Sequence, residues 1–314
     1  MADLREPGAD PWRALRWRAQ AMHAIRAHFA ATGALEIDPP ILQPGANLDP
    51  GVVAQAVDTA EGRRWLPTSP EHPLKRLVAA GAGAVWALSP VVRVGERGRR
   101  HLPEFRMLEW YRPGWTLDRL IDETIAVLAL LSGRTQPVQR TTWRAAFHRH
   151  AGIDPHGADP AALHALSREL HLPRPLDDAD ERELRLDWIW SQRVEPAFAA
   201  GAWHVVLAWP AGRAGQARVR RDADGFHAAE RFEIVCDGLE LANGYDECPD
   251  AEELARRFAA LAAQQPGAEP DQRLLAAIRA GFPPCAGVAV GFDRVAMLGL
   301  GVDDIRKTTA FPDG

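Results

Sequence analysis

The sequence predicts an α+β fold in which an antiparallel sheet is flanked by helices. Several short alternating segments follow one another without regular helices between them, which favours antiparallel pairing. The phosphate loop and the dinucleotide fingerprint of doubly wound folds are both missing from the sequence. The 314 residues, 46% hydrophobic and 25% charged, have ordinary globular composition. We expect a single catalytic-type domain over residues 1–314, with an insertion near 141–196.

The first elements are a helix and a short strand. Apolar residues recur at steps of three and four over residues 11–31, and Gly33 ends this helix. Residues 35–38 alternate like a strand and stop at Pro39 and Pro40, where the missing amides prevent continuation. Residues 49–64 lack periodicity, so we expect a polar connection there.

The next elements are a helix over residues 72–80, a strand near 85–92 and a strand around 105–111. A second long helix covers residues 117–131, introduced by the capping hydroxyl of Thr116. Residues 141–196 have short helices separated by Pro and Asp. The remaining elements are strands at 203–209, 217–221 and 231–237, helices at 251–264 and 271–280, a strand at 287–291 and a helix at 292–300.

The composition excludes several classes of protein. A net charge of −5 argues against a protein that grips nucleic acid with its whole surface. The cations are almost all Arg, because only Lys75 and Lys307 are lysines. Three cysteines without metal-site spacing give no disulfide framework. The chain has neither an apolar run of about 20 residues nor a signal core, so we expect a cytoplasmic protein without a membrane span.

Four segments carry residues suited to chemistry. They are TSPE at 68–71, RVGERGRRHLPEFRMLEWY at 93–111, GLELANGYDE at 238–247 and GVAVGFDR at 287–294. Each also has a purely structural explanation. The arginines of the second segment could form a charged hairpin tip, Asn243–Gly244 could be a hairpin turn, and Asp293–Arg294 could cap a helix.

Together the four segments predict a site for a nucleoside triphosphate. Arg93 follows a strand and Arg294 opens a helix, and both guanidinium groups match phosphate oxygens. On a straight strand Glu240 and Glu247 would face opposite sides. A turn at Asn243–Gly244 would let Glu240 hold Mg²⁺ while Glu247 meets an ammonium group. Phe105 could then stack on a base.

The order and spacing of these segments resemble the catalytic domain of class II aminoacyl-tRNA synthetases of the lysyl branch. Residues 33–40 resemble motif 1, residues 93–111 motif 2 and residues 287–294 motif 3. The strings HLPEFRMLEWY and ELANGYDE are highly specific in combination. The resemblance covers residues 11–311 and implies ATP-dependent formation of an aminoacyl-adenylate with Mg²⁺. It also implies a homodimer built on motif 1.

The resemblance implies two sets of site residues. Arg93, Arg294 and Glu240 would act in catalysis, and Glu240 and Glu247 would be candidate metal ligands. The ATP site would comprise Arg93, Phe105, Glu240, Leu241, Gly291 and Arg294. The amino-acid substrate would be lined by Ser69, Pro70, Glu71, Glu109, Tyr111, Glu247 and Ala289.

Within the lysyl branch the chain resembles stand-alone ligases that attach (R)-β-lysine to a lysine of translation elongation factor P. It enters motif 1 almost at once, so we expect no anticodon-binding domain and no contact with a tRNA anticodon. Ser69 and Ala289 occupy positions where the synthetases have Ala and Gly. The added bulk is expected to favour (R)-β-lysine over α-lysine.

Two departures from motif 2 keep other functions open. Gly95 stands where the family has Glu, and Leu102 stands where it has Asn. These replacements leave room for a non-catalytic paralogue that binds an amino acid and regulates a partner. Another stand-alone class II amino-acid ligase is a second alternative. Aspartate would need a cation at the side-chain end of the pocket, whereas Glu71 and Glu247 suit an amine. No dedicated base for the acceptor amine is evident.

Overall fold

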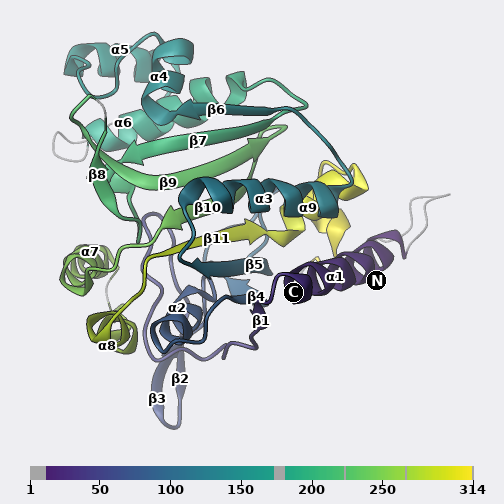
Figure 1. The fold of residues 1–314 in the computed structure, drawn as a ribbon. Helices are drawn as coiled ribbons and strands as arrows, with labels where there is room; N and C mark the ends of the chain where they lie inside the picture. The colour runs from purple at the N-terminus through teal and green to yellow at the C-terminus, as the bar shows by residue number, and fades with distance from the viewer. Residues whose placement is uncertain (1–11, 173–180, 223, 266, 313–314) are drawn as a thin grey trace. The chain divides into compact units, whose positions relative to one another are not determined.

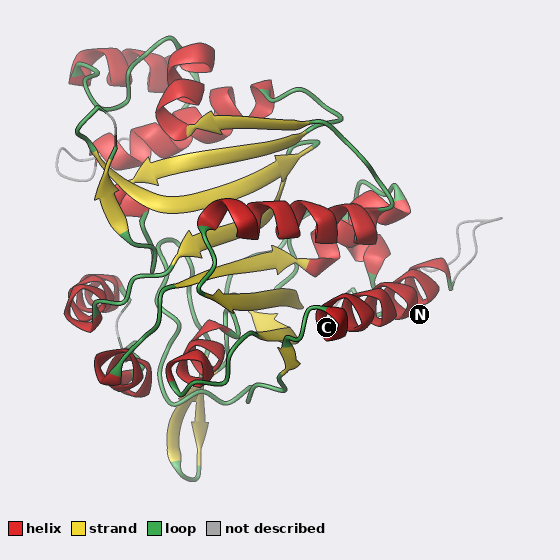
Figure 2. Cartoon of the chain, in the orientation of Figure 1, coloured by secondary structure: helices red, strands yellow, loops and turns green. Residues whose placement is uncertain are grey.

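A computed structural model describes residues 12–172, 181–222, 224–265 and 267–312 (Figure 1). The chain divides into two compact units. The first comprises Met1–Thr135, Gly215–Arg218 and Leu241–Gly314, and the second comprises Gln136–Ala214 and Val219–Glu240. Both units combine strands with helices (Figure 2), which confirms the α+β class.

The first unit contains a mostly antiparallel set of strands. Their order is β1, β4, β5, β11 and β10. Only the β1–β4 pair is parallel among these neighbours, and β4–β5, β5–β11 and β11–β10 are antiparallel. The predicted strands are confirmed at β1, β4, β5 and β11 with small changes of length, whereas β10 was not among the predicted strands. Their bounds are Leu35–Glu36 (β1), Val85–Val92 (β4), Glu104–Pro113 (β5), Cys285–Gly291 (β11) and Leu239–Asp246 (β10).

The helices of the first unit begin and end close to the predicted residues. Thr116 caps α3 by accepting a hydrogen bond from the Arg119 N–H, and Gly133 ends the helix with a φ of +69°. Pro11, predicted as the first residue of the first helix, lies outside the described residues. The bounds are Arg13–Ala31 (α1), Glu71–Ala79 (α2), Leu117–Ser132 (α3), Ala251–Gln264 (α7), Gln272–Ala280 (α8), Phe292–Leu300 (α9) and the 3-10 helix Ile305–Thr308 (η5).

The two faces of the first unit's strands have different partners. On one face Phe29 of α1 stacks on Trp86 with ring centroids 4.8 Å apart, and it also contacts Trp110. Side chains alternate across a strand, so Glu109 and Tyr111 point to the opposite face. There Tyr111 packs in a cluster with Leu74 of α2. That second face carries the predicted amino-acid site.

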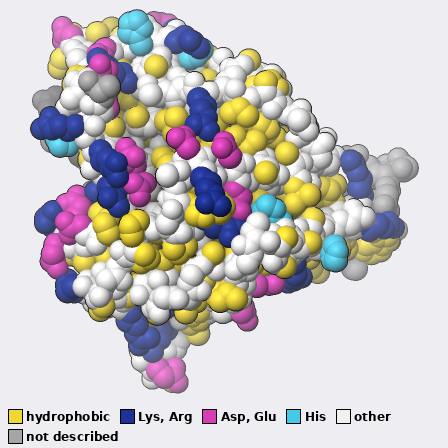
Figure 3. Space-filling model, in the orientation of Figure 1, with side chains coloured by type: hydrophobic (Ala, Val, Ile, Leu, Met, Phe, Trp, Pro, Cys, Tyr) yellow, Lys and Arg dark blue, Asp and Glu magenta, His cyan; other side chains and the backbone are white. Residues whose placement is uncertain are grey.

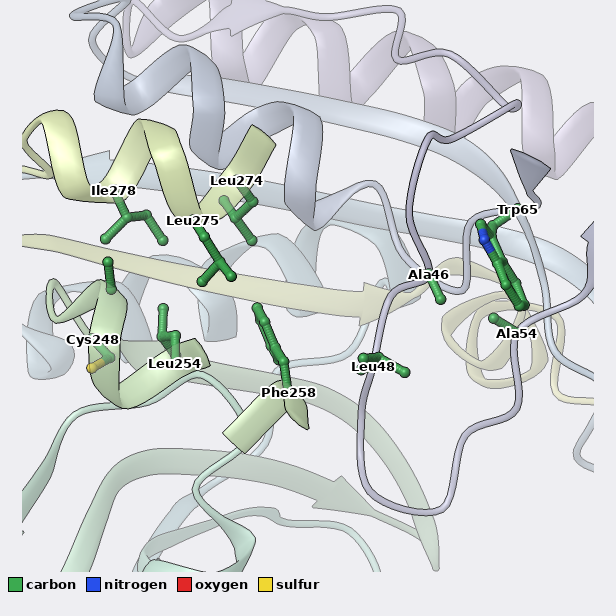
Figure 4. Close-up of a cluster of buried hydrophobic side chains, with 11 residues drawn as sticks. Ala46, Leu48, Ala54, Trp65, Cys248, Leu254, Phe258, Leu274, Leu275 and Ile278 are labelled. Carbon is green, nitrogen blue, oxygen red and sulfur yellow. The ribbon is translucent and has the colours of Figure 1, made fainter. Parts of the chain in front are cut away.

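A second apolar cluster joins α7 and α8 to the segment after β1 (Figure 4). Phe258 and Leu274 pack there with Trp65 and the loop residue Leu48. Trp65 ends a hairpin of β2 (Ala56–Thr59) and β3 (Gly62–Trp65).

This hairpin corrects the prediction that residues 49–64 are a polar connection. Most of its side chains are exposed or half-buried, so it has no buried face to give it a period of two. Gly62 has a φ of +105°, which favours glycine at the start of the returning strand.

Asn243–Gly244 is not a turn, which corrects the interpretation of ELANGYDE. Asn243 pairs with Ala289 and Gly244 with Val288, in the middle of β10. The chain instead turns just before β10, where Asp237 and Gly238 have φ of +51° and +70°. Asp-Gly serves this purpose as well as Asn-Gly. Glu247 is therefore the first residue after β10, and no turn at Asn243–Gly244 places it.

The second unit contains β6 (Val138–Thr142), β7 (Trp203–Pro210) and β9 (His227–Cys236) in that order, with β8 (Val219–Arg221) on β9. The β6–β7 pair is parallel, whereas β7–β9 and β8–β9 are antiparallel. The predicted insertion, 141–196, falls in this unit, although its residues 173–180 lie outside the described residues. Its helices are Trp143–Ala151 (α4), Pro160–Glu169 (α5) and Glu181–Ile189 (α6), followed by the π-helix Trp190–Val194 (η2).

Two surface properties accord with the composition. On the face shown in Figure 3, basic and acidic side chains are interspersed rather than gathered into one basic patch. Of the helices in the described part of the chain, none is both long enough and apolar enough to span a bilayer.

Candidate active site

The segments TSPE, HLPEFRMLEWY and ELANGYDE meet in a buried polar cluster in the first unit. Ser69, Glu71, Glu109, Tyr111 and Glu247 are all at most 6% exposed. They come from the N-terminal end of α2, from β5 and from the residue after β10. Buried acids at this density are unusual in a structural core, so the cluster is the candidate amino-acid end of the site.

Ser69 and Tyr111 hold Glu109. The Ser69 hydroxyl donates to Glu109 Oε2 at 2.5 Å and accepts from the Glu71 N–H at 3.0 Å. The Tyr111 hydroxyl donates to Glu109 Oε1 at 2.6 Å. Burial, and then the nearby charge of Glu71, raise the pKa of Glu109 to about 8. The residue at position 69 thus contributes a hydrogen bond as well as bulk.

Lys75 lies in the same cluster and was missed by the sequence analysis. Its Nζ is 2.6 Å from Glu71 Oε1 and 2.5 Å from Glu247 Oε2. Burial opposes its charge, but Glu247 and Glu71 outweigh burial and raise the pKa of the ammonium. Burial raises the pKa of Glu247 to about 8, against the opposing effect of Lys75. The available signal was a lysine four residues after Glu71 in a chain that uses Arg for nearly all of its other basic residues.

Glycine at 287 is required for the approach of two of these side chains. Gly287 pairs with Tyr111 across β11 and β5. A Cβ at this position would lie 2.3 Å from Tyr111 Cε1 and 2.6 Å from Glu247 Oε1. Ala289 pairs with Glu109 and is half-buried on the same face. Pro70, also buried, is the residue that precedes α2.

The residues predicted for ATP are more open than the acidic cluster. Arg93, Phe105, Gly291 and Arg294 are half-buried, and Leu241 is buried on β10. The guanidinium carbon of Arg93 lies 5.3 Å from the centroid of the Phe105 ring, and its Nε donates to the Thr68 carbonyl at 3.3 Å. An arginine stacked on an aromatic ring beside a strand end suits a base and phosphates.

Arg294 contacts the loop between β4 and β5. Its Nη2 lies 2.8 Å from His101 Nε2, and its Nε lies 3.4 Å from the Arg100 carbonyl. Because guanidinium groups only donate, His101 Nε2 is the acceptor. The adjacent Asp293 contacts Arg18 of α1 and accepts from the Arg106 N–H at 2.6 Å. Asp293 therefore joins α9 to α1 and β5.

The two residues that depart from motif 2, Gly95 and Leu102, differ in their surroundings. Gly95 has a φ of +84°, and a Cβ there would meet nothing within 4 Å. Leu102 is 6% exposed and packs inside. Glu96 lies next to Gly95, and its Oε1 is 3.6 Å from Arg93 Nη1. A carboxylate therefore lies beside Arg93 although position 95 has lost one.

The metal-binding role of Glu240 and Glu247 remains a prediction. Within the described ranges, no three His, Cys, Asp or Glu side chains are grouped to hold a metal ion. Mg²⁺ with a nucleotide usually needs only one or two carboxylates besides phosphate oxygens. Glu247 already contacts Lys75, whereas Glu240 is half-buried in the second unit.

Comparisons with known proteins agree with this geometry. The family profile described as tRNA synthetases class II (D, K and N) matches residues 2–314. A protein of Mannheimia succiniciproducens named elongation factor P–(R)-β-lysine ligase is 37% identical, covering 98% of this chain and 96% of that protein. Proteins of the same name from Pasteurella multocida and Klebsiella pneumoniae are 36% and 37% identical, each covering 94% of this chain and 93% of the relative. The chain therefore belongs to the class II tRNA synthetase family that includes the D, K and N enzymes.

Proposed function

We propose that this chain is an ATP-dependent, AMP-forming ligase that activates (R)-β-lysine and transfers it to a lysine ε-amine of elongation factor P. Class II synthetases and their ligase relatives use ATP, generally with Mg²⁺. The names of relatives over nearly the whole chain support the acceptor and the amino acid. Homodimer formation through motif 1 is part of the same proposal.

The observation that carries the proposal is the buried acidic cluster. Glu71, Glu109 and Glu247 outnumber the ammonium of Lys75 within it. A ligand amine would favour the ionised form of Glu109 and Glu247, whereas a ligand carboxylate would raise their pKa values further. The cluster therefore favours a lysine-like substrate over aspartate or asparagine.

The first step joins the substrate carboxylate to the α-phosphorus of ATP, and pyrophosphate leaves with the electron pair of the broken P–O bond. Arg93 and Arg294 would bind phosphate oxygens and stabilise the developing charge. Phe105 would stack on adenine and help to fix the reacting atoms in line. Mg²⁺ bound at Glu240 would supply further neutralisation of the phosphates.

The second step transfers the aminoacyl group to the acceptor protein. The acceptor ε-amine attacks the carbonyl carbon of the mixed anhydride, an amide forms and AMP leaves. The amine has an ordinary pKa of about 10.4 and must lose a proton to react. A phosphate oxygen of the departing AMP or a carboxylate of the site would accept that proton.

The test is to incubate the chain with ATP, (R)-β-lysine and purified elongation factor P, and then to weigh the factor. We expect a mass gain of one lysyl residue that requires both ATP and amino acid. ATP–pyrophosphate exchange should be faster with (R)-β-lysine than with α-lysine. Exchange without transfer would point to another acceptor. Absence of both exchange and transfer would favour a regulatory, non-catalytic protein.

A further inference from the structure

The Lys75 ammonium contacts oxygen atoms of three side chains inside the acidic cluster. Besides Glu71 and Glu247, its Nζ donates to Gln216 Oε1 at 3.0 Å. The side chain is 1% exposed, and its ammonium lies about 6 Å from the ring centroids of Tyr111 and Tyr245. An ammonium with three acceptors and two aromatic neighbours has one well-defined position.

This position joins parts of the chain that are distant in sequence. Glu71 and Lys75 are one turn apart on α2, whereas Glu247 follows β10. Two buried carboxylates facing one another would repel and would take up protons. The ammonium between them offsets their negative charge and fixes their orientation, at the cost of desolvating three charges.

Gln216 is itself held in place, so the third contact is firm. Arg257 of α7 donates to the carbonyls of Gly215 and Ala217, at 3.0 and 2.8 Å. The Gln216 carbonyl accepts from the Cys248 N–H at 3.0 Å. The backbone on both sides of Gln216 is thereby anchored, and its side chain reaches Lys75 from a fixed point.

The Oε1 atom of Glu247 is not used by Lys75 and could accept a hydrogen bond from a second donor. Both Glu247 oxygens are buried without a hydrogen bond of good geometry among the described residues, but Oε2 has the ion pair with Lys75 at 2.5 Å whereas no ion pair is made by Oε1. Oε1 lies against Gly287, where there is no side chain to cover it. A buried carboxylate oxygen without a donor is energetically costly and is well suited to a ligand ammonium.

We propose that Lys75 is a positioning residue for amino-acid recognition, whose ammonium orients Glu71 and Glu247 so that their remaining oxygens receive the substrate amine. This inference rests on the proposed function, since it assumes that the acidic cluster binds an amine. Lys75 transfers nothing itself. It acts by fixing the two carboxylates that bind the substrate.

The chain's two lysines allow a direct test on the unaltered protein. With ¹⁵N-labelled lysine, Lys75 and Lys307 give the two side-chain ammonium signals in an NMR spectrum. Lys75 should exchange its protons slowly, and saturating (R)-β-lysine with ATP should shift its signal. Lys307 is half-exposed and should stay unchanged. A Lys75 signal that does not respond to saturating substrate would overturn the positioning role.

A variant pair gives the second test. Lys75→Met should raise the amino-acid KM at least tenfold in ATP–pyrophosphate exchange, with the ATP KM changed less than twofold. The KM rise should be steeper at low pH, because removal of the neighbouring cation raises the pKa of Glu247 further and protons then compete with the substrate ammonium. Lys307→Met is the matched control and should leave both KM values unchanged.

The outcomes separate this inference from the proposed function. No amino-acid-dependent exchange by the wild-type chain would overturn both. An active wild type with an unchanged amino-acid KM in Lys75→Met would overturn the role of Lys75 alone. Equal rises in the two KM values would show that Lys75 supports the whole fold and would equally reject the role. If Lys75→Met does not fold, the NMR result decides.

Discussion

Two buried clusters, one in each unit, differ in the side chains they contain. The first unit buries a cluster of charges, in which Glu71, Lys75 and Glu247 make ion pairs away from water. The second unit buries an aromatic cluster, in which Trp143 stacks with Trp190 at 6.1 Å between ring centroids and contacts Phe147 at 4.5 Å. Buried ion pairs contribute little net stability, whereas aromatic burial contributes much. The comparison agrees with the proposal that the first cluster binds a ligand, and it predicts that the second contributes mainly to stability.

The second unit also contains a buried acid, Glu233, so the difference between the two clusters is one of degree. Glu233 is paired with Arg231, which also lies over the Trp209 ring at 4.8 Å. Burial, and then the charge of Glu240, raise the pKa of Glu233 to about 8. A single acid held by an arginine and an indole ring is a smaller departure from an apolar core than the cluster around Lys75.

The largest expected effect is on folding of the second unit. Trp143→Ala removes an indole that is 2% exposed, and we expect a loss of about 3–5 kcal/mol in the free energy of unfolding. Urea denaturation measures it. Phe311→Ala, at a side chain 78% exposed, is the control and should change little. A small loss for Trp143→Ala would mean that the aromatic cluster is loosely packed, and the contrast between the units would weaken.

The next effect is on chemistry in the first unit. Arg294→Ala removes a half-buried guanidinium from the predicted phosphate site, so kcat/KM for exchange should fall by about 10²–10³-fold. The melting temperature should hardly move. Arg279→Ala, in an exposed ion pair with Glu252, is the control and should keep full activity. Loss of stability without a specific loss of rate would show that Arg294 has a structural role with His101.

These residues show what the sequence can predict. Periodicity located β4 and α9 to the residue, because their apolar patterns are strong and their ends carry distinct signals. The family resemblance implied Ser69, Glu109 and Tyr111 as substrate-site residues, and the structure brings them into hydrogen-bonding contact. Residues that act through short segments of fixed spacing are therefore accessible from the sequence.

Other features depend on contacts between distant parts of the chain. Lys75 lies in a helix whose pattern is typical of many helices, and only Glu247 and Gln216 reveal its role. Asn243–Gly244 has turn chemistry, yet pairing with β11 on one side overrides that local preference. Tertiary pairing decides in such cases, and a single sequence does not record it.

The pH dependence of stability tests two of the raised pKa values in parallel, one from each unit. Glu109 in the first unit and Glu233 in the second each rise from 4.5 to about 8. Between these values the folded chain keeps protons that the unfolded chain releases, so stability should fall from pH 4.5 to 8 and then level off. Each group contributes a slope of at most about 1.4 kcal/mol per pH unit.

Glu109→Gln and Glu233→Gln should each reduce the slope of stability against pH by the contribution of one titrating proton, at most about 1.4 kcal/mol per pH unit. Urea denaturation at several pH values measures the slope. Glu169→Gln, in an exposed ion pair with Arg193, should leave the slope unchanged. An unchanged slope in Glu233→Gln alone would mean that Arg231 keeps Glu233 ionised. The second unit would then bury an ion pair, as the first does.

The smallest expected effect concerns substrate choice. Ser69→Ala removes the hydrogen bonds to Glu109 and from the Glu71 N–H, each worth about 0.5–1.5 kcal/mol. We expect a fall of about 5- to 10-fold in kcat/KM for (R)-β-lysine, and a smaller fall for α-lysine, since Ala lets Glu109 move toward the arrangement that the synthetase resemblance implies. Exchange assays with both amino acids give the ratio, and Ser191→Ala at an exposed residue of the second unit is the control. Equal falls for both substrates would assign Ser69 to general support of Glu109, and discrimination would then rest on Ala289.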